Sequence, residues 1–287
     1  MKNCSRKFAA AFIWIVALQC MDAHSAQPPS PQRVQKAKGI FQVGRIANPR
    51  IDESSGVVPA AKADQFWTHN DGKDSTLFLI NASGESLAQF TVIAPSVGDW
   101  EDIARDEQGN LYLADVGNNF AVRKEVAVHR FAEPVAGETN GSVKADKSWR
   151  LRFPEAAFDC EAFFVWRGDG YLVSKVFNDQ RAVIYRFPLE STNTTITLER
   201  VVELPVTSPV TGADLSADGA TLGLVTGSGS YLFRVAGNLK RAGEVRPRFA
   251  GFREGQIEGC CFVPEGLLAV SEKRQVFLYT PAAYRDK

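Results

Sequence analysis

The chain has 287 residues, of which 33 are basic, 33 are acidic and 45% are hydrophobic. This balance gives a formal net charge of zero, and no long basic tract interrupts it. The composition therefore argues against a nucleic-acid-binding protein and against one held to anionic membranes by charge. The length is sufficient for one large all-β domain behind an N-terminal targeting segment.

Residues 1–25 are predicted to form a signal peptide. A basic start precedes an apolar stretch, residues 8–20, that is short for a membrane span. Ala23 and Ser25 then supply the small side chains that a signal peptidase reads. A lipoprotein with Cys20 as the lipidated residue is the alternative, although the residue before it is not small. We therefore expect a secreted or periplasmic protein with no stable membrane insertion after the signal is removed.

Residues 26–38 are interpreted as an extended, proline-containing linker, and residues 39–287 as one domain. Helical periodicity is nearly absent from this domain, and short strand-like runs alternate with Gly, Asp and Asn turns. Evenly spaced short strands of this kind indicate a sandwich, a barrel or a propeller.

An internal repeat decides among these folds. Each unit has an acidic residue, a nearby small residue, an apolar run, a turn and a second strand, and the units recur about every 50 residues, the size of a propeller blade. The five units begin at Glu53, Glu101, Glu161, Asp214 and Glu258. We therefore predict an all-β, five-bladed β-propeller with four antiparallel strands per blade. A sixth, degenerate blade between Glu101 and Glu161 is the alternative, and residues 39–46 should pair with the last blade to close the ring.

Polar residues also recur at the end of the second strand of these units. The start of the first strand and the end of the second lie at the same end of a hairpin, so both sets should meet around the mouth of a central channel. The first set is Glu53, Glu101, Glu161, Asp214 and Glu258, and the second is Asn70 with Asp71, Asp115, Lys175, Thr226 and Glu272. The sequence thus predicts a polar, carboxylate-rich ring on one face of the propeller.

The carboxylates of this ring have the chemistry of a calcium site. Hard oxygen ligands suit Ca²⁺, and a bound ion would relieve the repulsion among them. The expected metal ligands are Glu101, Asp115, Glu161 and Glu258, with Asn70 as a further oxygen donor. Alternatively, each acidic side chain caps backbone N–H groups or pairs with Lys175, Arg123 or Lys273 as part of the blade architecture. The residues expected to bind a ligand at the mouth are Asn70, Asp71, Asp99, Lys175, Arg123 and Asp214.

Two residues, Glu101 and His69, are candidates for activating water at this ring. His69 could act as a general base if Asp71 or Asp99 tuned its pKa. The alternative for His69 is a hydrogen-bonded structural histidine packed beside a tryptophan. Chemistry of the Ser-His-Asp type finds no support, because residues 227–230 form a turn with no helix after it.

Three cysteines remain after the predicted signal peptide, namely Cys160, Cys260 and Cys261. A disulfide from Cys160 to one of the adjacent pair and three buried free thiols are both compatible with the sequence. Their spacing does not match that of a zinc site.

The motifs, taken in order, resemble a family of uncharacterised secreted bacterial propellers. They are "ESSG", "WTHND", "DWEDIA", "LYLADVGNN" with Arg123 soon after, "FDCEAFF", "YLVSK", "TGADLSADG" and "GQIEG", and they cover roughly residues 50–275. That family carries similar DWEDIA and DIGDN signatures, and it looks distantly like the phytase-like and SdiA-regulated propellers. The resemblance implies a propeller fold, and the distant relatives imply calcium-supported hydrolysis of phosphoesters or esters.

Two departures from the family pattern bear on the metal. Asn118 stands where DIGDN has its second Asp, and Gly259 stands where the last blade has a small Ala. The loss of one carboxylate weakens the case for a multi-calcium site, whereas an amide oxygen still suits a site for one ion.

Two functions from different classes follow from these observations. The first is a secreted, calcium-dependent hydrolase of phosphoesters, esters or lactones that acts on a small-molecule substrate. The second is a non-catalytic binding or scaffolding propeller that recognises a protein or a glycan, since propellers serve both kinds of function. In either case we expect a monomer.

Overall fold

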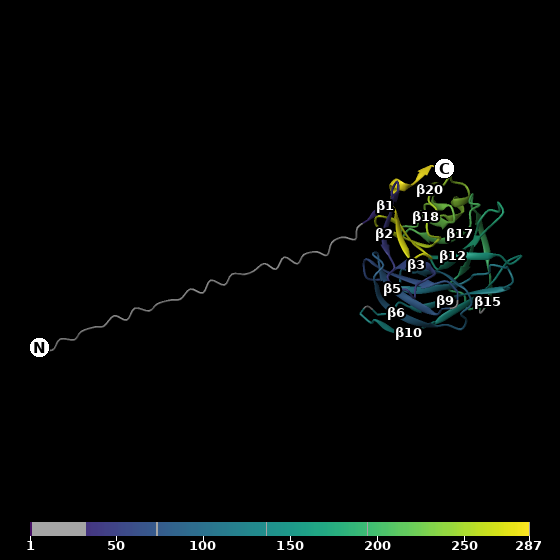
Figure 1. The fold of residues 1–287 in the computed structure, drawn as a ribbon. Helices are drawn as coiled ribbons and strands as arrows, with labels where there is room; N and C mark the ends of the chain where they lie inside the picture. Colours follow the sequence, from purple (N-terminus) through teal and green to yellow (C-terminus); the bar gives the residue numbers. More distant parts are fainter. Residues whose placement is uncertain (2–32, 73, 136, 194, 287) are drawn as a thin grey trace. The chain divides into compact units, whose positions relative to one another are not determined.

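The computed structural model describes residue 1 and residues 33–72, 74–135, 137–193 and 195–286. Residues 2–25 of the predicted signal peptide, including Cys20, and residues 26–32 of the predicted linker lie outside these residues. Residues 34–37, predicted as linker, form a strand. Within the described part, no helix is long and apolar enough to cross a membrane. The ribbon in Figure 1 is almost entirely β-structure, joined by two short 3-10 helices, η1 (Leu239–Gly243) and η2 (Pro281–Ala283).

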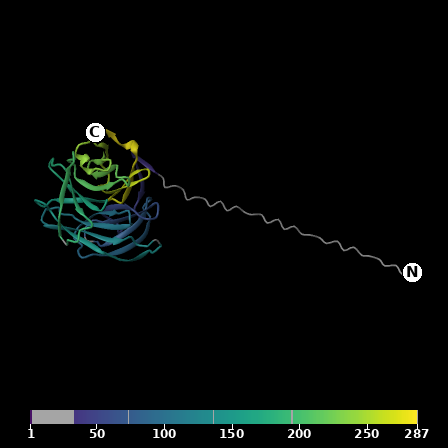
Figure 2. The ribbon, with the colours of Figure 1, turned by 180° about the vertical axis from the view of Figure 1, so that it is seen from behind.

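The strands form five sheets arranged in a ring, seen from opposite sides in Figures 1 and 2. The inner strands of the five sheets are β3 (Ser54–Pro59), β7 (Trp100–Arg105), β12 (Asp159–Trp166), β17 (Val210–Leu215) and β21 (Ile257–Val263). Each inner strand contacts the next, and β21 contacts β3 to close the ring. This confirms the five-bladed propeller, and the six-bladed alternative is wrong.

The remaining strands complete each blade outward from its inner strand. The first blade adds β4 (Gln65–Asn70), β5 (Thr76–Asn81), β6 (Ser86–Ile93) and β10 (Asn140–Lys144). The second adds β8 (Asn110–Asp115), β9 (Glu125–Ala132), β11 (Lys147–Arg152) and β15 (Thr195–Thr197). The third adds β13 (Asp169–Lys175), β14 (Val183–Pro188) and β16 (Glu199–Glu203). The fourth adds β18 (Thr221–Thr226), β19 (Gly229–Arg234), β20 (Arg248–Gly251) and β24 (Arg285–Asp286), and the fifth adds β22 (Gly266–Ser271), β23 (Gln275–Tyr279), β2 (Ile40–Arg45) and β1 (Val34–Ala37).

Four of the five blades have a fifth strand beyond the predicted four, and two of these outer strands pair in parallel. Strand β10 lies between β9 and β11 in the chain, yet it pairs in parallel with β6 of the preceding blade. Strand β15 likewise lies between β14 and β16 and pairs in parallel with β11 of the preceding blade. These exchanges cover outer edges that would otherwise leave backbone N–H and C=O groups without partners.

The ring is closed by the N-terminal part of the domain. Strand β2 pairs antiparallel with β23 of the last blade, with Ile40 opposite Tyr279. Ile40 is 2% exposed, so it contributes apolar surface to the core as well as backbone hydrogen bonds. The closure predicted for residues 39–46 is therefore confirmed.

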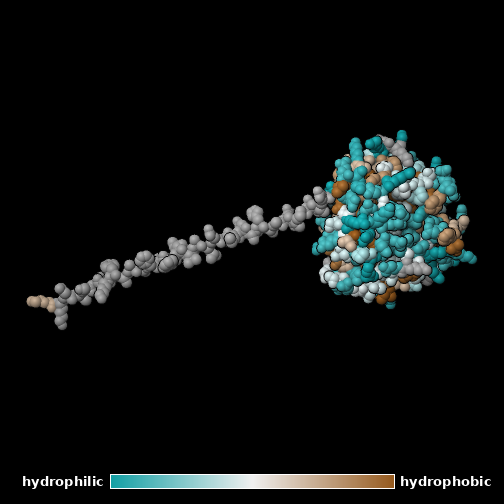
Figure 3. All heavy atoms as spheres, viewed as in Figure 1, coloured by the Kyte–Doolittle hydropathy of each residue, from teal (hydrophilic) through white to brown (hydrophobic). Residues whose placement is uncertain are grey.

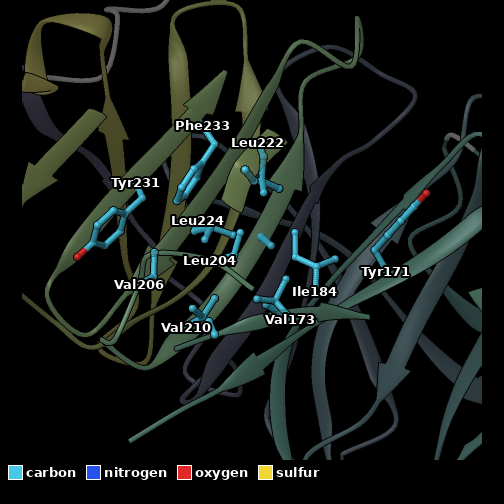
Figure 4. Close-up of a cluster of buried hydrophobic side chains, with 14 of the residues drawn as sticks. Tyr171, Val173, Ile184, Leu204, Val206, Val210, Leu222, Leu224, Tyr231 and Phe233 are labelled. Carbon is cyan, nitrogen blue, oxygen red and sulfur yellow. The ribbon is translucent and has the colours of Figure 1, made fainter. Parts of the chain in front are cut away.

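Buried apolar side chains fill the space between neighbouring blades. Figure 4 shows one such cluster, in which Val173 and Ile184 of the third blade lie near Leu222, Leu224 and Phe233 of the fourth. All five side chains are fully buried. By contrast, most of the surface visible in Figure 3 is hydrophilic, with apolar residues in small groups.

The three cysteines within the described residues belong to the interior and form no disulfide. Cys160, Cys260 and Cys261 are all buried and free. Burial raises the pKa of each thiol well above its usual range, so the reactive thiolate form is suppressed. Of the two interpretations compatible with the sequence, the structure shows the buried thiols.

The inner strands approach one another closely, and this explains the small residue near the acidic residue of the repeat. A Cβ atom on Gly259 would lie 2.1 Å from the carbonyl oxygen of Ser55 in the next inner strand. A Cβ atom on Gly212 would lie 2.5 Å from the carbonyl oxygen of Glu258. Any larger side chain at these positions would push two inner strands apart.

Candidate functional site

A β-bulge in every inner strand sets the direction of the acidic side chains. The pairing register shifts across Glu101 in β7, Glu161 in β12 and Glu258 in β21. The same shift occurs in β3 and β17. A bulge turns its extra residue out of the regular alternation. The three glutamates therefore meet at one end of the ring, which we call the mouth.

The fourth blade corrects one part of the predicted ring. Its bulge holds Thr211, not Asp214. Asp214 lies further along β17, and its carboxylate accepts hydrogen bonds from the backbone N–H groups of Leu215 (2.8 Å) and Phe262 (2.7 Å). Burial raises the pKa of Asp214 to about 7. Asp214 thus links β17 to β21 below the mouth, and Thr211 takes its predicted place.

Three carboxylates at the mouth can reach a single metal ion. One oxygen atom from each of Asp71, Asp99 and Glu101 lies within 4.8 Å of the other two. Asp71 is exposed, Asp99 is partly buried and Glu101 is buried. We call these residues the acidic trio. The sequence predicted the metal site at this end of the propeller, but of the trio it named only Glu101 as a metal ligand.

Backbone contacts between the first two blades bring the trio together. The N–H group of Trp100 donates to the carbonyl of Gly72 at 3.1 Å, which joins the segment after β4 to the start of β7. Gly117 then leaves room for the carboxylates. A Cβ atom there would lie 2.1 Å from Glu101 Oε1 and 2.5 Å from Asp99 Oδ2.

The mouth holds more negative charge than its surroundings neutralise. Burial, followed by the charges of Glu161, Asp71 and Asp99, raises the pKa of Glu101 far above its usual range. Burial and the charge of Glu161 raise the pKa of Glu258 to about 8. Burial and the charge of Asp99 raise the pKa of Asp71 to about 6. At neutral pH Glu101 and Glu258 therefore favour holding either a proton or a cation, whereas Asp71 is mostly ionised.

Lys175 neutralises one carboxylate of the mouth. Its ammonium forms an ion pair with Glu161. Burial alone would lower the pKa of Lys175, but the charges of Glu161, Asp159 and Glu258 raise it. Burial raises the pKa of Glu161, although Lys175 opposes that shift. Because Lys175 pairs directly with Glu161, the acidic trio keeps most of its own repulsion.

Asp115 and Arg123 hold the trio in place from below. Asp115 is fully buried and accepts hydrogen bonds from the backbone N–H groups of Gly98 (3.1 Å) and Asp99 (2.9 Å). Arg123 pairs with Asp115 at 2.9 Å and donates to the carbonyl of Gly117 at 2.7 Å. Burial would raise the pKa of Asp115, but the nearby His129 and Arg123 hold it well below its usual range. The structure therefore gives Asp115, predicted as a metal ligand, partners that fix the loop of Asp99.

The two asparagines of the motifs also bind backbone groups. Asn70 accepts from the N–H of Glu53 (3.3 Å) and donates to the carbonyl of Arg50 (2.7 Å). Asn118 accepts from the N–H of Arg123 at 2.9 Å. Asn118 also donates to the carbonyls of Arg123 (3.1 Å) and Phe158 (3.2 Å). Both amides thus order the loops around the mouth, as the structural alternative proposed for this ring.

His69 lies inside the protein rather than on the surface of the mouth. Its ring is fully buried and packs edge-on against Trp100, with ring centroids 5.9 Å apart. Nδ1 lies 2.8 Å from the carbonyl oxygen of Asn70. Burial lowers the pKa of His69 to about 4, so the ring is neutral at physiological pH. These observations favour the structural alternative for His69 over the general base.

Asp102, the third carboxylate of "DWEDIA", is a buried residue for which the sequence predicted no role. It accepts hydrogen bonds from the backbone N–H groups of Ile103 and Phe163, both at 2.9 Å. Phe163 belongs to the next inner strand, so the carboxylate joins β7 to β12. Asp102 does for the second and third blades what Asp214 does for the fourth and fifth. A second carboxylate directly after Glu101, at the start of an apolar run, was the available signal.

No protein-family model and no curated protein matches the chain. Among solved structures, the chain is similar to XC5397 from Xanthomonas campestris, described as a gluconolactonase important in glucose secondary metabolic pathways. The two share 10% identity with a TM-score of 0.48, over 89% of this chain and 96% of that protein. Likeness at this level carries no inference about activity, and the fold follows from the sheet topology described above.

Proposed function

We propose that this propeller binds one Ca²⁺ ion at Asp71, Asp99 and Glu101. Calcium–oxygen distances are about 2.3–2.6 Å, so two ligands on opposite sides of one ion lie about 5 Å apart. The 4.8 Å limit for the trio fits this range. Mg²⁺ binds oxygen at about 2.0–2.1 Å and is usually held by one or two carboxylates with several waters, so a site with three carboxylates suits Ca²⁺ better.

The observation that carries the proposal is the crowding of carboxylates around Glu101. Its side chain is 3% exposed and lies among other acidic groups, which raises its pKa. A cation that replaced the proton would remove both the desolvation penalty and the repulsion. Glu161 and Glu258 lie close enough to affect the same charge balance, so they would lower the energy of a bound cation further.

We further propose that the ion supports hydrolysis of an ester, a lactone or a phosphoester. When bound, Ca²⁺ would polarise the scissile carbonyl or phosphoryl group. We assign proton transfer to Glu258 rather than to Glu101, because Glu101 belongs to the acidic trio. The pKa of Glu258, raised to about 8, suits proton exchange near neutral pH. Lys175 would keep Glu161 charged and fixed beside it.

The metal content of the purified mature chain tests this proposal first. We expect about one Ca²⁺ per chain, lost on chelation with a clear fall in Tm, because a ligand of the folded state alone stabilises it by mass action. Glu101→Gln should abolish the calcium dependence while leaving the Tm of the chelated protein nearly unchanged. If the purified protein contains no metal and its Tm does not change when Ca²⁺ is added, the metal-dependent hydrolase proposal is wrong.

A recognition function is the second candidate, and exposed apolar side chains near the mouth favour it. Phe120 and Val122 lie on the loop after β8 and are 87% and 75% exposed. Phe177, on the loop after β13, is 51% exposed, and its ring centroid lies 5.9 Å from the ammonium of Lys175. This function would be supported over the hydrolase by two results together. The protein would bind a protein or glycan in a calcium-dependent way that Glu258→Gln does not change, and it would hydrolyse no ester.

A further inference from the structure

A cavity of about 190 Å³ opens at the mouth, and Glu258, the proposed proton-transfer residue, forms part of its wall. It is bounded by the fourth and fifth blades and by the loop that joins them, and its walls include Thr211, Thr226, Phe252, Arg253, Gln256 and Glu258. The volume is that of about six water molecules in the liquid. The cavity therefore suits a small polar fragment.

Arg253 is the cation of this cavity wall. Its side chain is exposed, and no described residue forms an ion pair with it. The neighbouring Glu254 is already paired with Lys36 at 2.6 Å. The guanidinium of Arg253 is therefore available to an anionic group of a ligand, and its planar donors match a carboxylate or a phosphate.

Two hydroxyl groups line the same cavity. Thr211 donates to the carbonyl of Ile257 at 2.7 Å, and Thr226 donates to the carbonyl of Gly229 at 2.8 Å. A hydroxyl oxygen has two acceptor lone pairs. Thr226 already accepts a hydrogen bond from the N–H of Ser228 at 3.2 Å, so Thr211 is the hydroxyl that can accept one from a ligand. Thr211 stands at the bulge position that holds a glutamate in three other blades. The cavity side of the mouth is thus less acidic than the trio side.

We propose that this cavity binds the anionic end of the substrate, with its carboxylate or phosphate at Arg253 and its hydroxyl-bearing body against Thr211 and Thr226. The reacting group then points toward Glu258 and the acidic trio. This inference rests on the proposed hydrolase and names its substrate class as small esters or lactones with a remote negative charge. Separation of charge across the mouth is the physical basis: the trio takes the cation, and Arg253 takes the anion.

A matched pair of chromogenic esters tests the inference with the calcium-loaded mature chain. Mono-4-nitrophenyl glutarate and 4-nitrophenyl pentanoate have acyl chains of equal length, but only the glutarate has a terminal carboxylate. We expect Arg253→Gln to lower kcat/KM for the glutarate about tenfold, mainly through KM, as for loss of one exposed charge-assisted contact. The effect on the pentanoate should be much smaller. Arg234→Gln is the control, because Arg234 lies at the end of β19 away from the cavity. It should leave kcat/KM unchanged for both esters.

Equilibrium binding separates a failure of this inference from a failure of the hydrolase. Titration calorimetry with glutarate and with glycerol 3-phosphate needs no turnover and shows which anion the cavity prefers. Binding that depends on Arg253, without hydrolysis of either ester, would support the cavity and contradict the hydrolase. If the protein hydrolyses both esters, and Arg253→Gln lowers kcat/KM for both equally or for neither, the hydrolase proposal stands and the inference is overturned. Failure of both anions to bind would also overturn it.

Discussion

Two carboxyl groups of the mouth, Asp71 and Glu258, have pKa values well above those of ordinary surface carboxyls. In the metal-free protein, the pKa of Asp71 is about 6 and that of Glu258 about 8, chiefly because burial disfavours the charged forms. Both values lie above the ordinary values of 3.8 and 4.5. The folded state therefore binds more protons than the unfolded state between about pH 4 and pH 8.

This proton uptake sets the pH dependence of stability. Because the folded pKa values are raised, the contribution of Asp71 and Glu258 to stability is complete below their ordinary pKa values of 3.8 and 4.5. We expect the Tm of the chelated protein to fall as the pH rises from there through about 6 and then about 8. Calcium affinity should rise over the same range, because the ligands must lose their protons. Melting curves at several pH values, with and without Ca²⁺, check both slopes. A chelated protein whose Tm rises from pH 5 to pH 8 would contradict this assignment.

Asp115 is expected to position the loop of Asp99 rather than to bind the metal, and this role can be tested. We expect Asp115→Asn to destabilise the fold by about 3 kcal/mol, because it breaks a buried ion pair with Arg123. It should also weaken Ca²⁺ binding, since the loop of Asp99 loses its anchor. Asp146→Asn is the control, because that side chain is 52% exposed in its pair with Arg130 and should change stability by less than about 0.5 kcal/mol. Urea unfolding and calcium titration give the two readouts.

At the scale of the element, the bulge of each inner strand and the small residue near it act together to build the mouth. The bulge turns a polar side chain to the mouth, and the small residue lets neighbouring inner strands approach. Gly259 illustrates the second part, since its Cα lies against the backbone of β3. The site therefore depends on backbone spacing as much as on the acidic side chains themselves.

Gly259→Ala should destabilise the protein by about 2–3 kcal/mol, because a methyl group would meet a backbone oxygen at 2.1 Å and force two inner strands apart. Gly227→Ala is the matched control, since the nearest atom to its added Cβ is a serine hydroxyl at 3.9 Å. Denaturant unfolding of both variants gives the comparison. Equal stability of the two variants would show that the inner strands can separate without penalty.

At the scale of the whole molecule, stability depends on ring closure by the N-terminal strands. Ile40→Ala removes a nearly buried side chain from β2 at the closing seam. We expect a loss of about 2–4 kcal/mol, as for other large-to-small changes in a core. Val34→Ala in β1, where the side chain is 54% exposed, should be nearly neutral. A neutral Ile40→Ala, measured by urea unfolding, would mean that the ring is stable without a tight seam.

The repeat predicted the blades, the seam and the strand ends at Asn70, Asp115, Lys175 and Thr226, because these depend on chain-local patterns of apolar and turn residues. It misplaced Asp214, whose shorter distance to the end of the second strand was a sign that it lies deeper than a bulge residue. The ion pair of Asp115 with Arg123 and the buried ring of His69 depend on how loops and neighbouring blades pack. The Asp115–Arg123 pair lies within the second blade, and pairing of a ring carboxylate with Arg123 was one of the alternatives compatible with the sequence. The contact of His69 with Trp100 joins two blades, and no local pattern encodes it.

The seam between β2 and β23 also has a consequence for the timing of folding. It joins Ile40 to Tyr279, which lie near opposite ends of the domain. Synthesis therefore delivers β2 first and its partner almost last, and for most of that time the N-terminal strand has an unsatisfied edge. Contacts between such distant residues form slowly, and free edges promote association with other chains. The ring therefore stays open, with the closing edge of β2 unpaired, until the last blade is complete.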